Sequence, residues 1–141
     1  MKKYEILEHT ADIRARIFAK NQEDLFVNSA ICLFELLTDK KAKAKDTKHI
    51  ELSASRLEDL LVIWLNELIS IFYSYKFLPV DYAVSISELS GVKKISADVR
   101  GIEFNPYGNK DVKSEIKAAT YHNLKIDKDS KGFAAEVIFD V

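Results

Sequence analysis

Residues 56–75 read RLEDLLVIWLNELISIFYSY, a long apolar stretch with the period of a helix. One stripe of this helix carries Leu57, Leu61, Trp64, Leu68 and Phe72. Further apolar residues widen the stripe to most of the circumference: Leu60, Val62, Leu65, Ile69 and Ile71. A helix that is apolar nearly all round is covered on all sides. We therefore predict that residues 56–75 form the central core element, with Trp64 in the core and not at a ligand site.

The segment before this helix predicts two strands, one helix and a third strand. Residues 3–9 and 12–20 have strand character, and the second alternates apolar with polar residues. Asn21 is placed to cap a helix that runs to about Thr38. The lysine-rich residues 40–48 predict a solvated connector, with a phosphate-binding patch as the alternative. A short strand follows at 48–53, and Ser55 with Glu58 predicts a capping box for the central helix.

After residue 79 the apolar period changes from helical to alternating. The predicted strands cover residues 80–86, 95–101, 116–124 and 133–141. The predicted turns and loops cover residues 90–91, 105–109 and 127–132. Runs of strands separated by only two helices indicate an α+β fold. We expect two amphipathic helices packed on a mixed or antiparallel β-sheet, in a single compact domain over residues 1–141.

Composition excludes several classes of function. The chain has 141 residues, with 21 basic and 22 acidic side chains and a net charge of -1. This balance argues against strong direct nucleic-acid binding. Cys32 is the only cysteine and lies in an apolar helical run, so we expect a buried free thiol in a reducing compartment. Since neither a signal peptide nor a membrane-spanning stretch is evident, a soluble, cytoplasmic protein is expected.

Motifs for catalysis are missing from the sequence. It contains no GxSxG elbow, no phosphate-binding glycine loop and no HExxH pair. The three histidines His9, His49 and His122 are far apart in the chain. We therefore predict no catalytic residue.

Carboxylates near the two ends of the chain suggest an oxygen-ligand site. Asp12 opens an amphipathic strand, and Asp140 and Val141 close the last predicted strand in phase with its alternation. If these ends meet, two side-chain carboxylates and a main-chain oxygen or carboxylate of Val141 converge, and such a cluster repels itself without a cation or proton. Oxygen ligands suit Ca²⁺ or Mg²⁺. The alternative is an ordinary strand-end aspartate and a solvated terminus.

The predicted strand 116–124 carries two further polar candidates. Lys117 shares one face with Ala119 and is expected to be a surface lysine. His122 shares the opposite, more apolar face with Ile116 and Ala118. It is expected to be a partly buried histidine.

Four blocks of sequence together resemble the archease family. They are EHTADI at 8–13, LLVIWLNEL at 60–68, EIKAATYH at 115–122 and VIFDV at 137–141. Each block is short, but all four occur in order and span the whole chain.

The resemblance implies a function that spacing alone does not. Archeases are accessory activators of the GTP-dependent RNA ligase that joins 3′-phosphate or 2′,3′-cyclic phosphate ends to 5′-hydroxyl ends, as in tRNA splicing. They promote guanylylation of the ligase and its multiple turnover. The implied metal ligands are Asp12, Asp140 and a main-chain oxygen of Val141, with Ca²⁺ expected first and Mg²⁺ or Mn²⁺ as alternatives. Lys117 falls in a block associated with activation, and His9 and His122 are weaker candidates for that role.

Two other classes of function remain open. One is a chaperone-like interaction module in which the cation is purely structural. The other is a metal-dependent hydrolase, which needs a general base or nucleophile beside the metal. The sequence offers no motif for such a group.

Overall fold

The computed structural model describes residues 1–9, 11–120 and 124–141, which form two helices and eight strands. The elements are β1 Tyr4–His9, β2 Asp12–Ala19, α1 Gln22–Leu37, β3 Asp46–Ala54, α2 Leu57–Ser74, β4 Phe77–Leu89, β5 Val92–Glu103, β6 Ala118–Thr120, β7 Ile126–Asp129 and β8 Gly132–Asp140. Neither helix in this part of the chain is long and apolar enough to cross a membrane.

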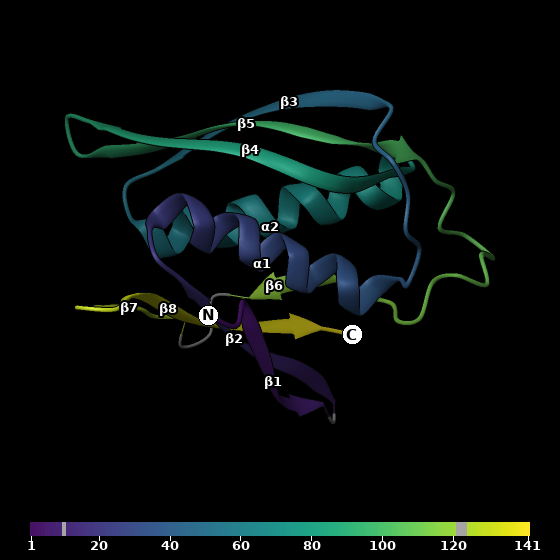
Figure 1. Cartoon of the computed structure of the whole chain (residues 1–141), viewed down its shortest axis with the longest axis horizontal. Helices are drawn as coiled ribbons and strands as arrows, with labels where there is room; N and C mark the ends of the chain where they lie inside the picture. The colour runs from purple at the N-terminus through teal and green to yellow at the C-terminus, as the bar shows by residue number, and fades with distance from the viewer. Residues whose placement is uncertain (10, 121–123) are drawn as a thin grey trace.

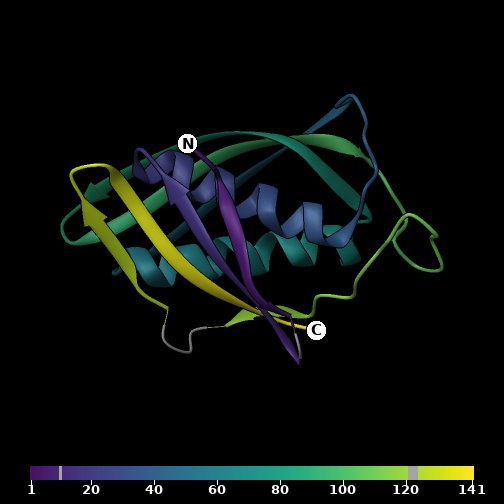
Figure 2. The same ribbon diagram turned by 60° about the horizontal axis from the view of Figure 1, so that its bottom comes forward.

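The two helices lie side by side between two β-sheets (Figure 1). The first sheet has the order β1-β2-β8-β6, and β7 also pairs with β8. The second sheet has the order β3-β5-β4. Helix α1 packs on β2 and β8 on one side and on β4 on the other, while α2 packs on β6 and on all three strands of the second sheet. Figure 2 shows β1, β2 and β8 crossing in front of the helix pair.

The predicted α+β fold with two helices is confirmed, but the strands form two sheets instead of one. Every strand pair in both sheets is antiparallel. The helical pattern of residues 56–75 explains why two sheets are needed. A helix that is apolar around most of its circumference exposes apolar surface unless it is covered from both sides.

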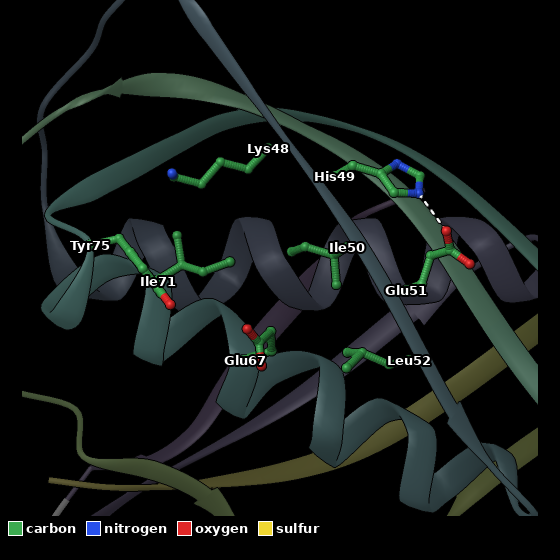
Figure 3. Close-up of a pocket in the computed structure, with 8 residues that line it drawn as sticks. All are labelled: Lys48, His49, Ile50, Glu51, Leu52, Glu67, Ile71 and Tyr75. Carbon is green, nitrogen blue, oxygen red and sulfur yellow. Dashed lines mark hydrogen bonds and ion pairs between the residues drawn. The ribbon is translucent and has the colours of Figure 1, made fainter.

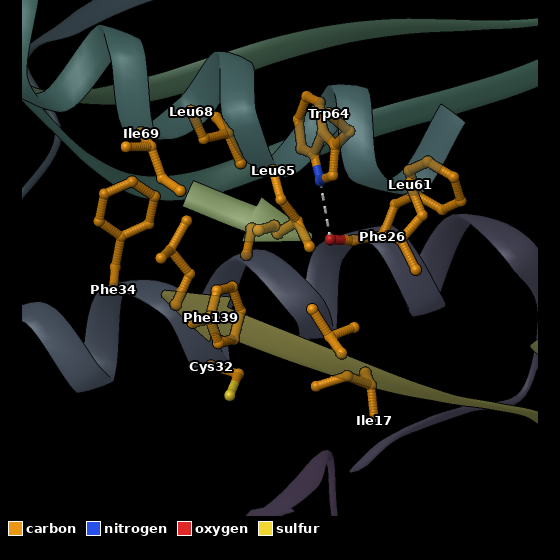
Figure 4. Packing of buried hydrophobic residues seen from close by; sticks show 14 of the residues in the cluster. Ile17, Phe26, Cys32, Phe34, Leu61, Trp64, Leu65, Leu68, Ile69 and Phe139 are labelled. Carbon is orange, nitrogen blue, oxygen red and sulfur yellow. Dashed lines mark hydrogen bonds between the residues drawn. The ribbon is translucent and has the colours of Figure 1, made fainter. Parts of the chain in front are cut away.

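Trp64 lies at the centre of the core, as predicted. Its side chain is fully buried, and its indole N–H donates a 3.0 Å hydrogen bond to the main-chain oxygen of Phe26 on α1 (Figure 4). This bond satisfies the one polar group of the indole ring. Cys32 is also fully buried and free, and burial raises the pKa of its thiol to about 12. The sulfur is therefore a protonated, unreactive core atom.

The two helices begin in different ways. Asn21 caps α1 as predicted, since its side-chain oxygen accepts a 2.8 Å hydrogen bond from the N–H of Asp24. The predicted capping box of α2 is wrong. The residue at the N-cap position of α2 is Arg56, and no side chain there makes a capping hydrogen bond. Packing between two sheets stabilises this helix without a capping side chain.

Two predicted boundaries in the last third of the chain differ from the structure. The strand predicted at 116–124 is the short β6 over its described part, and residues 121–123 lie outside the described residues. The connection predicted at 127–132 is partly a strand, because β7 continues to Asp129 and pairs with β8. Three of the four positions of β7 are exposed and carry polar residues. Its sequence therefore lacks the alternation of apolar and polar residues that predicts a strand.

Candidate functional site

The pairing of β2 with β8 places Asp12, at the start of β2, opposite Asp140, at the end of β8. The antiparallel register runs from Ala19 opposite Phe133 to Asp12 opposite Asp140. The neighbouring pair, Ile13 and Phe139, is fully buried. Because side chains alternate along a strand, Asp12 and Asp140 both project from the outer face of the first sheet.

Asp12 and Asp140 are close enough to repel each other. Side chains directly opposite in an antiparallel pair have β-carbons about 4.5–5.5 Å apart, and like charges there are destabilising. Asp12 is exposed and Asp140 is half-buried. Arg14, two residues along the same face, pairs instead with Glu136 at 3.4 Å and Glu8 at 4.0 Å. In the described ranges no basic side chain forms an ion pair with either aspartate.

Lys117 and Val141 lie beside this aspartate pair. The main-chain N–H of Lys117 donates a 2.8 Å hydrogen bond to the main-chain oxygen of Asp140, and Val141 follows Asp140 directly. Val141 is 39 % exposed, and Lys117 is also exposed, as predicted for a surface lysine. The structure therefore brings Asp12, Asp140, Val141 and the backbone of Lys117 to one corner of the first sheet.

The prediction of which face of the segment 116–124 points toward the core needs a correction. Ala119 is 4 % exposed, whereas Ala118 is only half-buried, so the core-facing residue of β6 is Ala119 and not Ala118. The alternation fails because β6 begins at Ala118. Ile116, which is fully buried, therefore lies outside the regular strand.

The two candidate histidines are placed only in part. The backbone of His9 ends β1, where it pairs with Ile13 next to Asp12. His122 lies outside the described residues. His49 is in β3 of the second sheet and so belongs to a different region.

The donor set at this corner fits a hard divalent cation. Its side chains offer carboxylate oxygens, which Ca²⁺ and Mg²⁺ prefer and soft metals do not. No group of three or more His, Cys, Asp or Glu side chains suited to a metal occurs among the residues that the structure describes. A cation here would thus need main-chain oxygen and water in addition to the two aspartates. A main-chain oxygen of Val141, next in the chain to Asp140, is suited to that role.

A separate cleft of about 560 Å³ lies between β3 and α2 (Figure 3). Its apolar lining includes Ile50, Leu52 and Ile71. Lys48 contributes a positive charge, and Glu51 and Glu67 contribute two negative charges. None of the predicted site residues lines this cleft. This cleft and the aspartate pair are therefore distinct features.

Asn66 is a site residue that sequence reasoning missed. Its side-chain oxygen accepts a 2.8 Å hydrogen bond from the main-chain N–H of Ala119, and its side-chain nitrogen donates a 3.0 Å bond to the oxygen of the same residue. Asn66 thereby connects α2 to β6, next to Lys117. The available signal was an asparagine within a predicted helix that is otherwise apolar around most of its circumference.

Comparison with known proteins identifies the family of this chain. A family model described as the archease protein family (MTH1598/TM1083) matches residues 4–141. The chain belongs to the archease family. A curated relative named "Protein archease" from Methanosarcina barkeri is 36 % identical over 142 residues, which cover 99 % of this chain and 97 % of that protein. Another from Pyrococcus abyssi is 33 % identical over the full length of both chains.

Solved structures share the archease fold seen here. The solution structure of Methanobacterium thermoautotrophicum protein 1598 superposes with a TM-score of 0.85 at 26 % identity, covering 100 % of both chains. A Thermotoga maritima protein described as "an archease, possible chaperone" gives a TM-score of 0.62 at 23 % identity, covering 97 % of this chain and 96 % of that one. The family assignment made from the four sequence blocks is therefore confirmed.

Proposed function

We propose that this archease is a non-catalytic activator of the RNA ligase that joins 3′-phosphate and 5′-hydroxyl ends in tRNA splicing. In this proposal Asp12, Asp140 and a main-chain oxygen of Val141 bind a divalent cation, with Ca²⁺ first and Mg²⁺ or Mn²⁺ as alternatives. The observation that carries the proposal is the cross-strand pair of Asp12 and Asp140 at an exposed corner of the sheet. The activity would take place in the cytoplasm, together with the ligase.

The corner suits action on a second protein. Asp12 and the side chain of Lys117 are exposed, so a partner surface can approach them. A cation bound there would offset negative charge on the GTP phosphates while the ligase is guanylylated. Lys117 would contact a phosphate or an acidic ligase residue as a compact point charge.

The direct test is guanylylation and multiple turnover of the partner ligase with Asp12→Ala and Asp140→Ala proteins. Both variants should lose activation by at least about tenfold, as expected for lost metal ligation. Asp46→Ala is the matched control, because Asp46 is an exposed strand-end aspartate of the other sheet. Normal activation by folded Asp12 and Asp140 variants would rule out the aspartate pair as the active element.

A chaperone-like module with a purely structural cation is the second candidate. The description of the Thermotoga maritima relative as a "possible chaperone" favours it. In that case removal of the cation would lower thermal stability but leave partner binding intact. Measuring both properties in EDTA, with the ligase immobilised, separates the two functions.

A further inference from the structure

Strand β6 is the shortest strand of the described chain and depends on few contacts. It has three residues, and it pairs with β8 through Ala118, Ala119 and Thr120. A segment this short makes few ladder hydrogen bonds, and its outer edge leaves main-chain groups without a strand partner. A half-buried N–H or C=O without a partner carries a desolvation cost.

Asn66 supplies the missing partner for β6. Its amide exchanges two hydrogen bonds with the main-chain N–H and C=O of Ala119, at 2.8 Å and 3.0 Å. An amide side chain can donate and accept at once, as the backbone of a neighbouring strand does. Ala119 is 4 % exposed and also packs against the core, so both its backbone and its side chain are held from the α2 side.

The position of β6 determines the geometry of the aspartate corner. Lys117 directly precedes β6 and donates its main-chain N–H to the oxygen of Asp140 at 2.8 Å. Asp140 in turn lies opposite both Ala118 of β6 and Asp12 of β2. A shift of β6 would therefore move Lys117 and the backbone of Asp140, while the pairing of β2 with β8 could persist.

We propose that Asn66 is a positioning residue, which holds β6 against β8 so that Lys117 and Asp140 keep their register at the candidate cation site. Asn66 reaches the site only through Ala119 and makes no contact with the proposed ligand oxygens in the described structure. The link to cation binding rests on the proposed function, whereas the link to the position of Lys117 stands on the hydrogen bonds alone.

Amide hydrogen exchange of the main-chain N–H of Lys117 tests the structural part. Asn66→Ala should accelerate this exchange by about tenfold, because the N–H is protected only while β6 stays in place. Asn66→Leu removes the same two bonds and keeps most of the side-chain volume, so it serves if the alanine variant does not fold. Exchange of the amides in the centre of β2 should stay at the wild-type rate in both variants.

Asn28→Ala is the matched control for a lost helix-to-strand hydrogen bond. The side chain of Asn28 on α1 donates a 2.7 Å bond to the main-chain oxygen of Phe18, near the opposite end of β2. This variant should lose stability without changing the exchange of Lys117. Wild-type exchange of Lys117 in both Asn66 variants, or equal acceleration in Asn28→Ala, would overturn the proposal.

Calorimetric titration with CaCl₂ tests the link to the cation. Both Asn66 variants should bind Ca²⁺ about tenfold more weakly than the wild type, the low end for residues that orient ligands from outside. Asn28→Ala should bind as the wild type does. Faster exchange of Lys117 with unchanged Ca²⁺ affinity would overturn the positioning role at the cation site. If the wild type itself binds no divalent cation, the proposed function fails, and the exchange experiment still decides whether Asn66 holds Lys117.

Discussion

Two glycines are needed at their positions for different physical reasons. A β-carbon at Gly101 would overlap the main-chain oxygen of Leu78 and lie 2.9 Å from the ring of Phe77. Gly108 has open space around it but a φ of +65°, which side chains rarely adopt. We expect Gly101→Ala to lower the free energy of unfolding by about 3 kcal/mol through overpacking. Gly108→Ala should lower it by about 1 kcal/mol through backbone strain.

Urea denaturation of the two glycine variants measures this difference. Both replacements add one methyl group, so each serves as the size control of the other. Equal losses of stability would contradict the assignment of close packing to Gly101.

His49 gives the second sheet a pH-dependent contact. Its Nδ1 lies 2.8 Å from Asp98 and its Nε2 3.0 Å from Glu51. Hydrogen bonds to Asp98 and then Glu51 raise the pKa of His49 above its usual value. The raised pKa means that this contact stabilises the folded state fully below the unfolded pKa of about 6.5, and the contribution is lost as the pH rises through the folded pKa.

Proton NMR titration of the imidazole checks this effect of pH. The midpoint should lie above about 6.5, and Asp98→Asn should lower it because the first of the two carboxylates is removed. Since His49 is exposed, the shift should also shrink in high salt. A midpoint at or below that of a model peptide would contradict the two contacts.

Strand β3 is an edge strand that carries a charge on its inner face. It pairs with β5 on one side in the sheet order β3-β5-β4. Lys48 lies on the same face as the buried Ile50, and its Nζ is 5.4 Å from the ring centre of Tyr75 and 5.1 Å from that of Phe77. An inward-pointing lysine discourages pairing between two exposed edges.

Replacing this lysine should promote association between copies of the chain. Lys48→Ile removes the charge and extends the apolar lining of the cleft, so sedimentation velocity should show a larger, concentration-dependent species. Lys43→Ile in the connector changes the same residue type at an exposed position away from the strand. Association of the Lys43 variant to the same degree would show that general hydrophobicity is responsible.

The elements with a strong period were predictable from the sequence, and the division into sheets was not. The helical stripe of residues 56–75 and the alternation in β2 specify α2 and β2 closely, since each follows one local period. Local periods carry no information on which strands pair. That β3 joins β5 while β2 joins β8 depends on packing around both sides of the helix pair.

The candidate site was predictable to a similar degree. Their positions at strand ends made Asp12 and Asp140 plausible ligands, and the resemblance to the archease family selected them. The register of β2 with β8 places them opposite each other. Asn66 was not selected, because its role depends on hydrogen bonds to Ala119, which is distant in the sequence. An isolated amide within an apolar helix gives no indication of which backbone groups it will meet.

If the aspartate pair binds a cation as proposed, the stability of the folded chain should depend on divalent cations. Without a cation, Asp12→Asn should raise the free energy of unfolding by about 0.5 kcal/mol, because it removes repulsion across the strand pair. With Ca²⁺ at about 100 times its dissociation constant, the wild type should gain about 2.7 kcal/mol and the variant much less. One substitution should thus have effects of opposite sign in the two conditions.

Urea unfolding in EDTA and in CaCl₂ measures the change in the free energy of unfolding under both conditions. Asp46→Asn is the control, since it removes an exposed aspartate from the other sheet without changing the corner. A lower stability of Asp12→Asn in EDTA would show that the carboxylate makes a favourable contact of its own. An equal Ca²⁺ increment in both proteins would place the cation elsewhere.

The pairing of β2 with β8 also constrains when the corner can form during synthesis. Asp12 leaves the ribosome early, but the strand that carries Asp140 is made only after both helices and the whole second sheet. Until then β2 has β1 as its neighbour and lacks the partner on its other side. Contacts between such distant segments form slowly because the chain must close a long loop. If Asp12 and Asp140 bind a cation as proposed, a nascent chain would therefore not bind it until β8 has paired with β2.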